Sequence, residues 1–265
     1  MSAIIIENGL AHYEAIGRGR PVILLHGWLG SWRYWMPTMD DLSDKFRTYA
    51  LDLWGFGDSD RRGDEYSLPA YVALLQRFMD EMGIDRAPLV GHALGGVVAL
   101  RFAAQMPERV EQVMAVATPV IGESVARPLA NFSGNHGDLV GRILGRRPVY
   151  PEIQMEIGKA DANALVYSVR AVLAEDLRQD METLDELRIP VLLVYGRNDP
   201  VILPPEERWL ARLEETTRAI YLEESRHFPM LDEMNKFNRL LRQFLEFKHS
   251  LEELALKEEW RRRTR

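Results

Sequence analysis

Short apolar runs alternate with amphipathic stretches along most of this chain. Runs without polar residues are typical of strands buried on both faces, and apolar positions spaced three and four residues apart are typical of helices packed on a sheet. Alternation on both sides of the turn Asn8–Gly9 predicts a hairpin of strands at 3–6 and 10–15. Further strands are predicted at 21–25, 48–53, 88–90, 110–117, 191–195 and 219–222. The amphipathic stretches predict helices at 32–43, 69–82 and 93–105, and a terminal helix that begins over 237–247. Strands that alternate with helices predict a mostly parallel sheet with helices on both faces.

The regular alternation breaks between Thr118 and about Leu187. This stretch is too long for a loop in a compact sheet, and much of it has helical periodicity. We therefore predict a core formed by 1–118 and 187–265, with a charged tail from about 248, and a helical cap over 119–186. Ligands of α/β sheets bind at the carboxyl edge of the strands, so the site is expected between the core and the cap.

Composition and charge narrow the classes of function. The 265 residues are 46% hydrophobic, include no cysteine and carry a formal net charge of -7. The lack of cysteine excludes disulfides, a thiolate nucleophile, iron–sulfur clusters and cysteine-ligated zinc. The charge gives no sign of nucleic-acid binding, and no apolar run reaches membrane-spanning length. No histidine pair has metal-ligand spacing beside a carboxylate, and the N-terminus does not resemble a signal peptide, so we expect a cytoplasmic protein without a metal or cofactor.

The segment Gly91-His92-Ala93-Leu94-Gly95 lies between a predicted strand and a predicted helix. In that context the pattern G-x-S-x-G is the nucleophile elbow, a strained turn that holds its central residue between strand and helix. Side chains two positions away on either side must be minimal, which explains the glycines. The central residue here is Ala93, so the elbow is present without its hydroxyl.

Further motifs accompany this elbow in a fixed order. They are Leu24-Leu25-His26-Gly27-Trp28, Asp52-Leu53-Trp54-Gly55-Phe56-Gly57, Gly196-Arg197-Asn198-Asp199-Pro200 and Ser225-Arg226-His227-Phe228-Pro229. Together they resemble the α/β-hydrolase family over nearly the whole chain. The resemblance implies that His227 is the general base and that Asp199 holds its tautomer. It also implies that the backbone N–H groups of Trp28 and Leu94 form the oxyanion hole. The order Ala93, Asp199, His227 matches the family order of nucleophile, acid and histidine.

Alanine at position 93 leaves the reaction open. It keeps both backbone donors of the oxyanion hole and removes only the covalent step. Residue 93 is either an engineered replacement of serine or natural, because some family members that resemble aminoacrylate hydrolases carry the same Gly-His-Ala-Leu-Gly elbow. Neither the aspartate of haloalkane dehalogenases and epoxide hydrolases nor the cysteine of dienelactone hydrolases stands at this position.

Three functions therefore stay open. The first is a hydrolase that acts on an ester, lactone, thioester or similar acyl bond of a small apolar substrate. The second is a cofactor-free enzyme, such as a lyase, hydratase or oxygenase, in which His227 and Asp199 form a dyad that activates water or transfers a proton. The third is a ligand-binding protein without turnover.

Other residues near the motifs admit a structural or a functional interpretation. Trp28 is expected to border the substrate. His92 either binds the substrate or, like His26, is hydrogen-bonded inside a turn. His12 is predicted to lie at the surface. The charged tail is either a helix packed on its own domain or the contact of a homodimer, and the other partner that we expect is the small-molecule substrate. Core packing is predicted for the aromatic residues Trp32, Tyr34 and Trp35.

Overall fold

The computed structural model describes residues 2–63, 65–126, 129, 140–143, 150–213, 216–246, 251 and 254. Its centre is one sheet of eight strands in the order β1-β2-β4-β3-β5-β6-β7-β8. The strands are β1 (Ser2–Ile6), β2 (Gly9–Gly17), β3 (Arg20–Leu25), β4 (Phe46–Leu51), β5 (Ala87–His92), β6 (Val110–Val116), β7 (Val191–Gly196) and β8 (Thr217–Leu222). β1, β2 and β4 pair antiparallel, and the strands from β4 to β8 pair parallel. Each predicted strand overlaps one of these, and the predicted mostly parallel sheet is confirmed.

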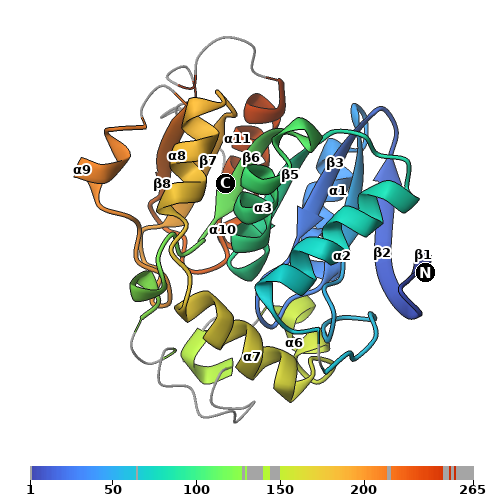
Figure 1. The fold of residues 1–265 in the computed structure, drawn as a ribbon. Coiled ribbons are helices and arrows are strands. Elements are labelled where there is room, and N and C mark those ends of the chain that lie inside the picture. The colour runs from blue at the N-terminus through green and yellow to red at the C-terminus, as the bar shows by residue number, and fades with distance from the viewer. Residues whose placement is uncertain are drawn as a thin grey trace, which may run out of the picture.

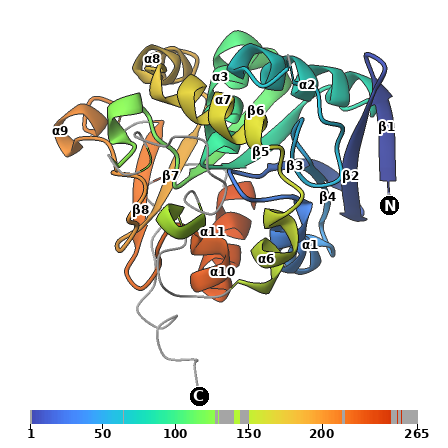
Figure 2. The same cartoon turned by 90° about the horizontal axis from the view of Figure 1, so that it is seen from below.

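Helices cover both faces of the sheet (Figures 1 and 2). On one face α3 (Leu94–Gln105) lies between α2 (Leu68–Glu81) and α8 (Arg178–Glu186) and packs against both. On the other face α1 (Met36–Leu42) packs against α11 (Met234–Glu246). The shorter helices are η1 (Trp32–Trp35), η2 (Pro107–Arg109), η3 (Gly122–Ser124), α9 (Glu207–Leu210) and α10 (Pro229–Asp232).

Local sequence signals explain where these elements begin and end. β5 and β7 are buried along their whole length, as expected for central strands with helices on both faces. α2 begins where the Ser67 hydroxyl accepts a hydrogen bond from the N–H of Ala70, with Pro69 in the first turn, where a missing N–H is tolerated. It ends before Gly83, whose φ of +64° turns the chain out of the helix.

The break in the alternation is an insertion, which we define as residues 121–176. Its two ends pair with each other in an antiparallel bridge between Ile121 and Asp176. Between them α6 (Pro151–Ile157) and α7 (Ala162–Leu173) lie below the sheet in Figure 1. The cap was expected to begin at 119, close to this bridge, and to end at 186. Because α8 packs against α3 on the face of the sheet, we place the end of the insertion before α8.

The first residues of the insertion, Ser124 to Ala126, also pair with the loop that follows β7. The N–H of Ala126 donates to the carbonyl oxygen of Val201 at 2.8 Å. The N–H of Leu203 donates to the carbonyl oxygen of Ser124, also at 2.8 Å. The base of the insertion is therefore attached to the main chain directly after β7. Part of the insertion, between 127 and 149, lies outside the described residues.

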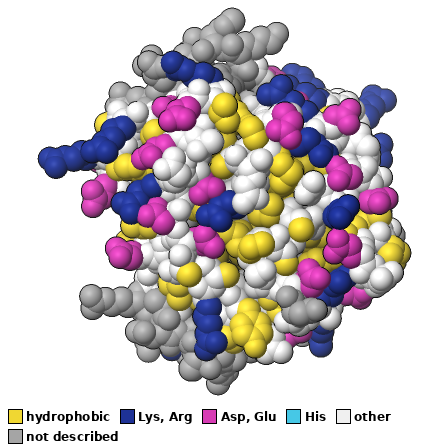
Figure 3. Space-filling model, in the orientation of Figure 1, with side chains coloured by type: hydrophobic (Ala, Val, Ile, Leu, Met, Phe, Trp, Pro, Cys, Tyr) yellow, Lys and Arg dark blue, Asp and Glu magenta, His cyan; other side chains and the backbone are white. Residues whose placement is uncertain are grey.

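The surface carries charges of both signs. Figure 3 shows acidic and basic side chains interspersed over one face of the molecule. No helix within the described ranges is long and apolar enough to cross a membrane. In the predicted tail, Leu251 and Leu254 are buried, and the carbonyl oxygen of Leu251 accepts a hydrogen bond from the Arg218 guanidinium at 3.0 Å. The other tail residues lie outside the described part of the chain.

Candidate active site

Ala93 stands at the apex of the turn between β5 and α3. Its φ of 46° and ψ of -110° lie outside the regions that alanine ordinarily adopts. The flanking glycines make this turn possible. A Cβ at Gly95 would lie 2.6 Å from the carbonyl oxygen of His26, and one at Gly91 would overlap the carbonyl oxygen of Gly95. The backbone geometry of a nucleophile elbow is thus kept around a side chain that cannot attack a substrate.

His227 and Asp199 meet at the carboxyl edge of the sheet, where they follow β8 and β7. Nδ1 of His227 lies 3.0 Å from Oδ2 of Asp199, and the two side chains are 1% and 2% exposed. Oδ1 of Asp199 accepts from the N–H groups of Val201 at 2.7 Å and Ile202 at 3.2 Å. Because a carboxylate only accepts, the proton in the histidine contact lies on Nδ1, which leaves Nε2 as the basic atom. Nε2 is buried, and no described residue hydrogen-bonds to it.

Two unpaired backbone donors lie on the turns that meet at the elbow. Trp28 belongs to the turn after β3, and Leu94 is the first residue of α3, where an N–H has no acceptor within the helix. Among the described residues, none accepts a hydrogen bond from the N–H of Trp28 or of Leu94. The two turns are in contact, since a Cβ at Gly27 would lie 2.8 Å from the Cβ of Ala93. The chain therefore carries both donors of the predicted oxyanion hole beside the elbow.

The ring of Trp28 faces the insertion. It is fully buried, and its Nε1 donates to the Ser168 hydroxyl of α7 at 3.1 Å. Trp28 thus contributes a main-chain N–H to the elbow side and an indole N–H to the insertion side. Two further hydrogen bonds join the insertion to the core: Tyr66 donates to Asp161 at 2.9 Å, and Tyr150 donates to Asp232 at 2.5 Å.

His92 and His26 are fully buried, and protein groups bind both ring nitrogens of each. Nδ1 of His92 lies 3.0 Å from the Tyr34 hydroxyl, and its Nε2 lies 2.8 Å from the carbonyl oxygen of His227. Nε2 of His26 accepts from the N–H of Leu53 at 2.9 Å. Burial lowers the pKa of both histidines, and that of His92 strongly. Since neither nitrogen of His92 is left for a substrate, these contacts support its structural interpretation.

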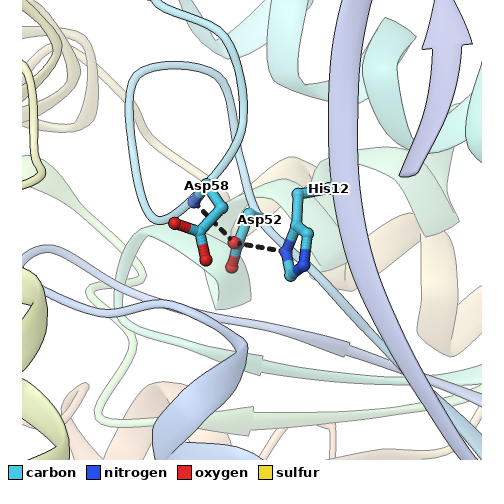
Figure 4. Close-up of side chains that lie close together, drawn as sticks. All are labelled: His12, Asp52 and Asp58. Carbon is cyan, nitrogen blue, oxygen red and sulfur yellow. Dashed lines mark hydrogen bonds and ion pairs between the residues drawn. The ribbon is translucent and has the colours of Figure 1, made fainter. Parts of the chain in front are cut away.

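The prediction that His12 lies at the surface is wrong. His12 is 2% exposed, and its Nδ1 lies 2.9 Å from Oδ2 of Asp52 (Figure 4). The Asp52 carboxylate also accepts from the N–H groups of Asp58 at 3.0 Å and Trp32 at 2.7 Å. Burial opposes protonation of His12, but the hydrogen bond and the charge of Asp52 outweigh it and raise the pKa of His12.

His12, Asp52 and Asp58 bring possible metal ligands within 4.8 Å of one another. Protein donors already use these groups: Asp52 accepts the contacts above, and Asp58 pairs with Nζ of Lys159 at 2.7 Å. We therefore interpret the cluster as a structural one that orders the loop after β4. The signal for it was Asp52 itself, directly after an apolar strand, because a buried carboxylate requires a partner.

Ion pairs around Glu156 join the insertion to the core. Glu156, on α6, is 2% exposed, and its Oε1 lies 2.5 Å from Nε of Arg33 and 3.2 Å from Nζ of Lys159. Lys159 reaches Asp58 as well, and the Arg33 guanidinium lies over the ring of Trp32, 4.6 Å from its centroid. We call Arg33, Asp58, Glu156 and Lys159 the insertion clamp.

Comparison with known proteins agrees with this architecture. A family model described as the alpha/beta hydrolase fold matches residues 20–139. The chain is 28% identical over 258 residues to a pimeloyl-[acyl-carrier protein] methyl ester esterase from Aeromonas hydrophila, which covers 88% of this chain and 98% of that relative. It is 26% identical over 262 residues to a 2-hydroxy-6-oxo-2,4-heptadienoate hydrolase from Pseudomonas putida, which covers 91% of this chain and 95% of that relative.

A solved structure repeats the fold over almost the same length. The enol-lactonase from Burkholderia xenovorans superposes with a TM-score of 0.78 at 21% identity, over 93% of this chain and 100% of that one. The sheet order, the strained elbow between β5 and α3, and the carboxylate–histidine pair after β7 and β8 are the arrangement that the sequence motifs predicted. The family model, the relatives and the solved structure together support an α/β-hydrolase family for this chain.

Proposed function

We propose that this protein hydrolyses an ester, lactone, thioester or similar acyl bond of a small apolar substrate with a water molecule that His227 activates. The observation that carries the proposal is a complete dyad beside an elbow that keeps its strain around alanine. The dyad distance is 3.0 Å, and Ala93 holds a φ of 46°. A strained φ of this kind costs on the order of 1–3 kcal/mol and persists where the surrounding structure fixes it.

The proposed reaction needs no covalent intermediate. Nε2 of His227 takes one proton from water, and the resulting hydroxide oxygen bonds to the acyl carbon while the carbonyl π electrons move onto oxygen. The N–H groups of Trp28 and Leu94 donate to that oxyanion. When the acyl–oxygen or acyl–sulfur bond breaks, the leaving group takes the proton back from Nε2. Asp199 stabilises the imidazolium between the two transfers.

The relatives support hydrolysis as the class of reaction. Their names denote a methyl ester esterase, a heptadienoate hydrolase and an enol-lactonase. We call the turn after β3, which contains Gly27 and Trp28, the oxyanion turn. We further propose that the insertion acts as the cap of the site, because Trp28 of this turn is hydrogen-bonded to Ser168 on α7. In this proposal the core supplies the chemistry and the insertion selects the substrate.

The same dyad also suits cofactor-free proton transfer, and the alanine at position 93 favours this as a second candidate. A lyase or hydratase would use Nε2 of His227 to remove a proton from carbon instead of from water. The two candidates differ in one respect: only the hydrolase needs the N–H groups of Trp28 and Leu94 to stabilise an acyl oxyanion.

The first experiment compares the unchanged protein with Ala93→Ser, His227→Gln and the double variant. Each is assayed on short-chain aryl esters and treated with a fluorophosphonate. We expect the unchanged protein to hydrolyse esters without labelling, and His227→Gln to lower kcat by about 10²–10⁴-fold. Ala93→Ser should be labelled covalently, and the double variant should not be.

His12→Gln is the matched control, because His12 is another buried histidine held by a carboxylate, with 2.9 Å between Nδ1 and Oδ2 of Asp52. Its kcat should equal that of the unchanged protein. Ester turnover that does not depend on His227 contradicts the mechanism. If neither the unchanged protein nor Ala93→Ser reacts, the proposed hydrolase is wrong, and the assay moves to proton exchange at carbon and to ligand binding.

A further inference from the structure

A chain of buried hydrogen bonds runs behind the elbow through Tyr34 and His92. The N–H of Gly27 donates to the Tyr34 hydroxyl at 2.6 Å. That hydroxyl lies 3.0 Å from Nδ1 of His92, whose Nε2 lies 2.8 Å from the carbonyl oxygen of His227. These hydrogen bonds therefore join Gly27, in the turn after β3, through Tyr34 and His92 to the main chain of His227.

The groups at the two ends of this hydrogen-bond network determine which atom donates and which accepts in every bond of the network. The N–H of Gly27 can only donate, and the carbonyl oxygen of His227 can only accept. Nε2 of His92 must then carry a proton, since a bare nitrogen would face an oxygen lone pair at 2.8 Å. A neutral His92 has a bare Nδ1, so the Tyr34 hydroxyl donates to it and accepts from Gly27. These assignments follow from the network, without any observed hydrogen.

His92 stays neutral beside a group that changes its charge. The ring is fully buried, and the ring centroids of His92 and His227 lie 4.8 Å apart. Burial and then the nearby positive charge of a protonated His227 hold the pKa of His92 well below its usual value. No described carboxylate is hydrogen-bonded to His92. A neutral His92 can hold the His227 carbonyl throughout the reaction without competing for its proton.

Glycines in the sequence leave room for the rings of Tyr34 and His92. A Cβ at Gly30 would lie 2.9 Å from Cζ of Tyr34, so a larger residue there would displace the ring. A Cβ at Gly27 would lie 2.8 Å from Nδ1 of His92. Phe228 packs against Tyr34 and His92, with ring centroids 6.1 and 5.0 Å away. The two aromatic rings are thus confined from several sides, and their hydrogen bonds have one geometry.

We propose that Tyr34 and His92 are positioning residues, which together hold the oxyanion turn and the main chain of His227 against the elbow. This proposal rests on the proposed function for one point only, the catalytic roles of the oxyanion turn and of His227. It gives a buried tyrosine of the predicted core a part in the site. In this proposal His92 does not contact the substrate but supports His227, the residue proposed to activate water.

The first test is nuclear magnetic resonance of the full chain with labelled histidine ring nitrogens. We expect His92 to be the Nε2–H tautomer and to stay neutral at neutral pH. In Tyr34→Phe the bare Nδ1 of His92 should shift because it loses its donor. The Nδ1–H resonance of His227 should also shift or broaden, because the main chain of the base is held less firmly. A protonated His92 at neutral pH, or an Nδ1–H tautomer, overturns the proposal.

The matched control is Thr38→Val. Thr38 donates to Asn238 at 2.9 Å between α1 and α11, so this variant also removes a buried hydroxyl and leaves a buried partner unpaired. Both variants should lower stability, but only Tyr34→Phe should move the His227 resonance. Equal effects on His227 in both variants would show a merely structural role for Tyr34.

The second test measures the rate of fluorophosphonate labelling in the Ala93→Ser background. Adding Tyr34→Phe should slow labelling by about 10²-fold, the effect of a small misplacement of reacting groups, and Thr38→Val should leave it unchanged. His92→Gln keeps a donor for the His227 carbonyl and should label faster than His92→Leu. An unchanged rate in Tyr34→Phe also overturns the proposal. If Ala93→Ser itself is not labelled, the proposed function fails, and the resonance test still decides on the positioning role.

Discussion

The core side of the site and the insertion side are held by different kinds of contact. On the core side the elbow, the turn after β3 and His227 are held by backbone hydrogen bonds and by fully buried rings such as Tyr34 and His92. On the insertion side the clamp consists of charged side chains, among which Arg33 is 31% exposed and Lys159 is 33% exposed. Geometry that depends on backbone contacts changes only when the fold changes. Geometry that depends on side-chain ion pairs can change with single substitutions.

This difference in contacts separates the part of the site proposed to carry the chemistry from the part proposed to select the substrate. In the proposed function the reacting groups lie on the sheet and at its strand ends, which belong to the architecture of the fold. In the proposed function the insertion faces them across the site, and partly exposed cations of the clamp help to hold it there. We expect substitutions in the core to act on folding or on kcat, and substitutions in the clamp to act first on the insertion and on KM.

A pair of glycine substitutions gives the largest expected contrast. Gly95→Ala would place a Cβ 2.6 Å from the carbonyl oxygen of His26, in backbone that cannot move away, and should destabilise the fold by about 3 kcal/mol or more. Gly158→Ala at the end of α6 meets no atom within 4 Å and has an ordinary φ of -75°. It should be neutral or stabilise by up to about 1 kcal/mol. Chemical denaturation measures the free energy of unfolding of both variants. Equal losses of stability would contradict the contrast between the core and the insertion.

Arginine substitutions test the clamp. Arg33→Met leaves the buried Glu156 with Lys159 as its remaining cation and should cost about 1–2 kcal/mol of stability, with KM raised more than kcat is lowered. Arg197 is a matched control, because it also stacks on an aromatic ring, that of Tyr221, and pairs with a carboxylate at 3.2 Å. Its partner Glu223 is 52% exposed, so Arg197→Met should cost less than about 1 kcal/mol. Thermal unfolding and steady-state kinetics distinguish them.

Two buried histidines should give pH dependences of opposite sign. The pKa of His92 is lowered by folding, so its contribution to stability is complete above about pH 6.5 and is lost as the pH falls toward the folded pKa. The pKa of His12 is raised, so its contribution is complete below about pH 6.5 and is lost as the pH rises through the folded pKa.

Denaturation of His92→Gln, His12→Gln and the unchanged protein between pH 5 and 9 measures this contrast. The stability difference between the unchanged protein and His92→Gln should shrink toward pH 5. The difference from His12→Gln should grow in the same direction. Each slope is limited to about 1.4 kcal/mol per pH unit for one proton. Slopes of the same sign for both variants would contradict the environments described for the two rings.

The sequence predicted what depends on local pattern. The strands and the elbow around Ala93 each lie within a few residues, so local pattern identifies them, and the Asp199 and His227 motifs were identified by their resemblance to the α/β-hydrolase family. The contacts that escaped prediction join distant positions: 40 residues separate His12 from Asp52, and 123 separate Arg33 from Glu156. The end of the cap, expected at 186, lies at the end of α8, whereas our definition of the insertion ends before this helix, for a related reason. α8 is a helix by its own sequence, and only its packing on α3 assigns it to the face of the sheet.

The pairing at the base of the insertion makes a thermodynamic linkage. The carbonyl oxygen of Val201 accepts from the N–H of Ala126 at 2.8 Å, and the N–H of Val201 donates to Oδ1 of Asp199 at 2.7 Å. A single residue thus touches both the segment that leads into the insertion and the carboxylate that lies 3.0 Å from Nδ1 of His227. Displacing the insertion would therefore disturb a contact of the Asp199 carboxylate, and by reciprocity a change at that carboxylate would alter how firmly the base of the insertion is held.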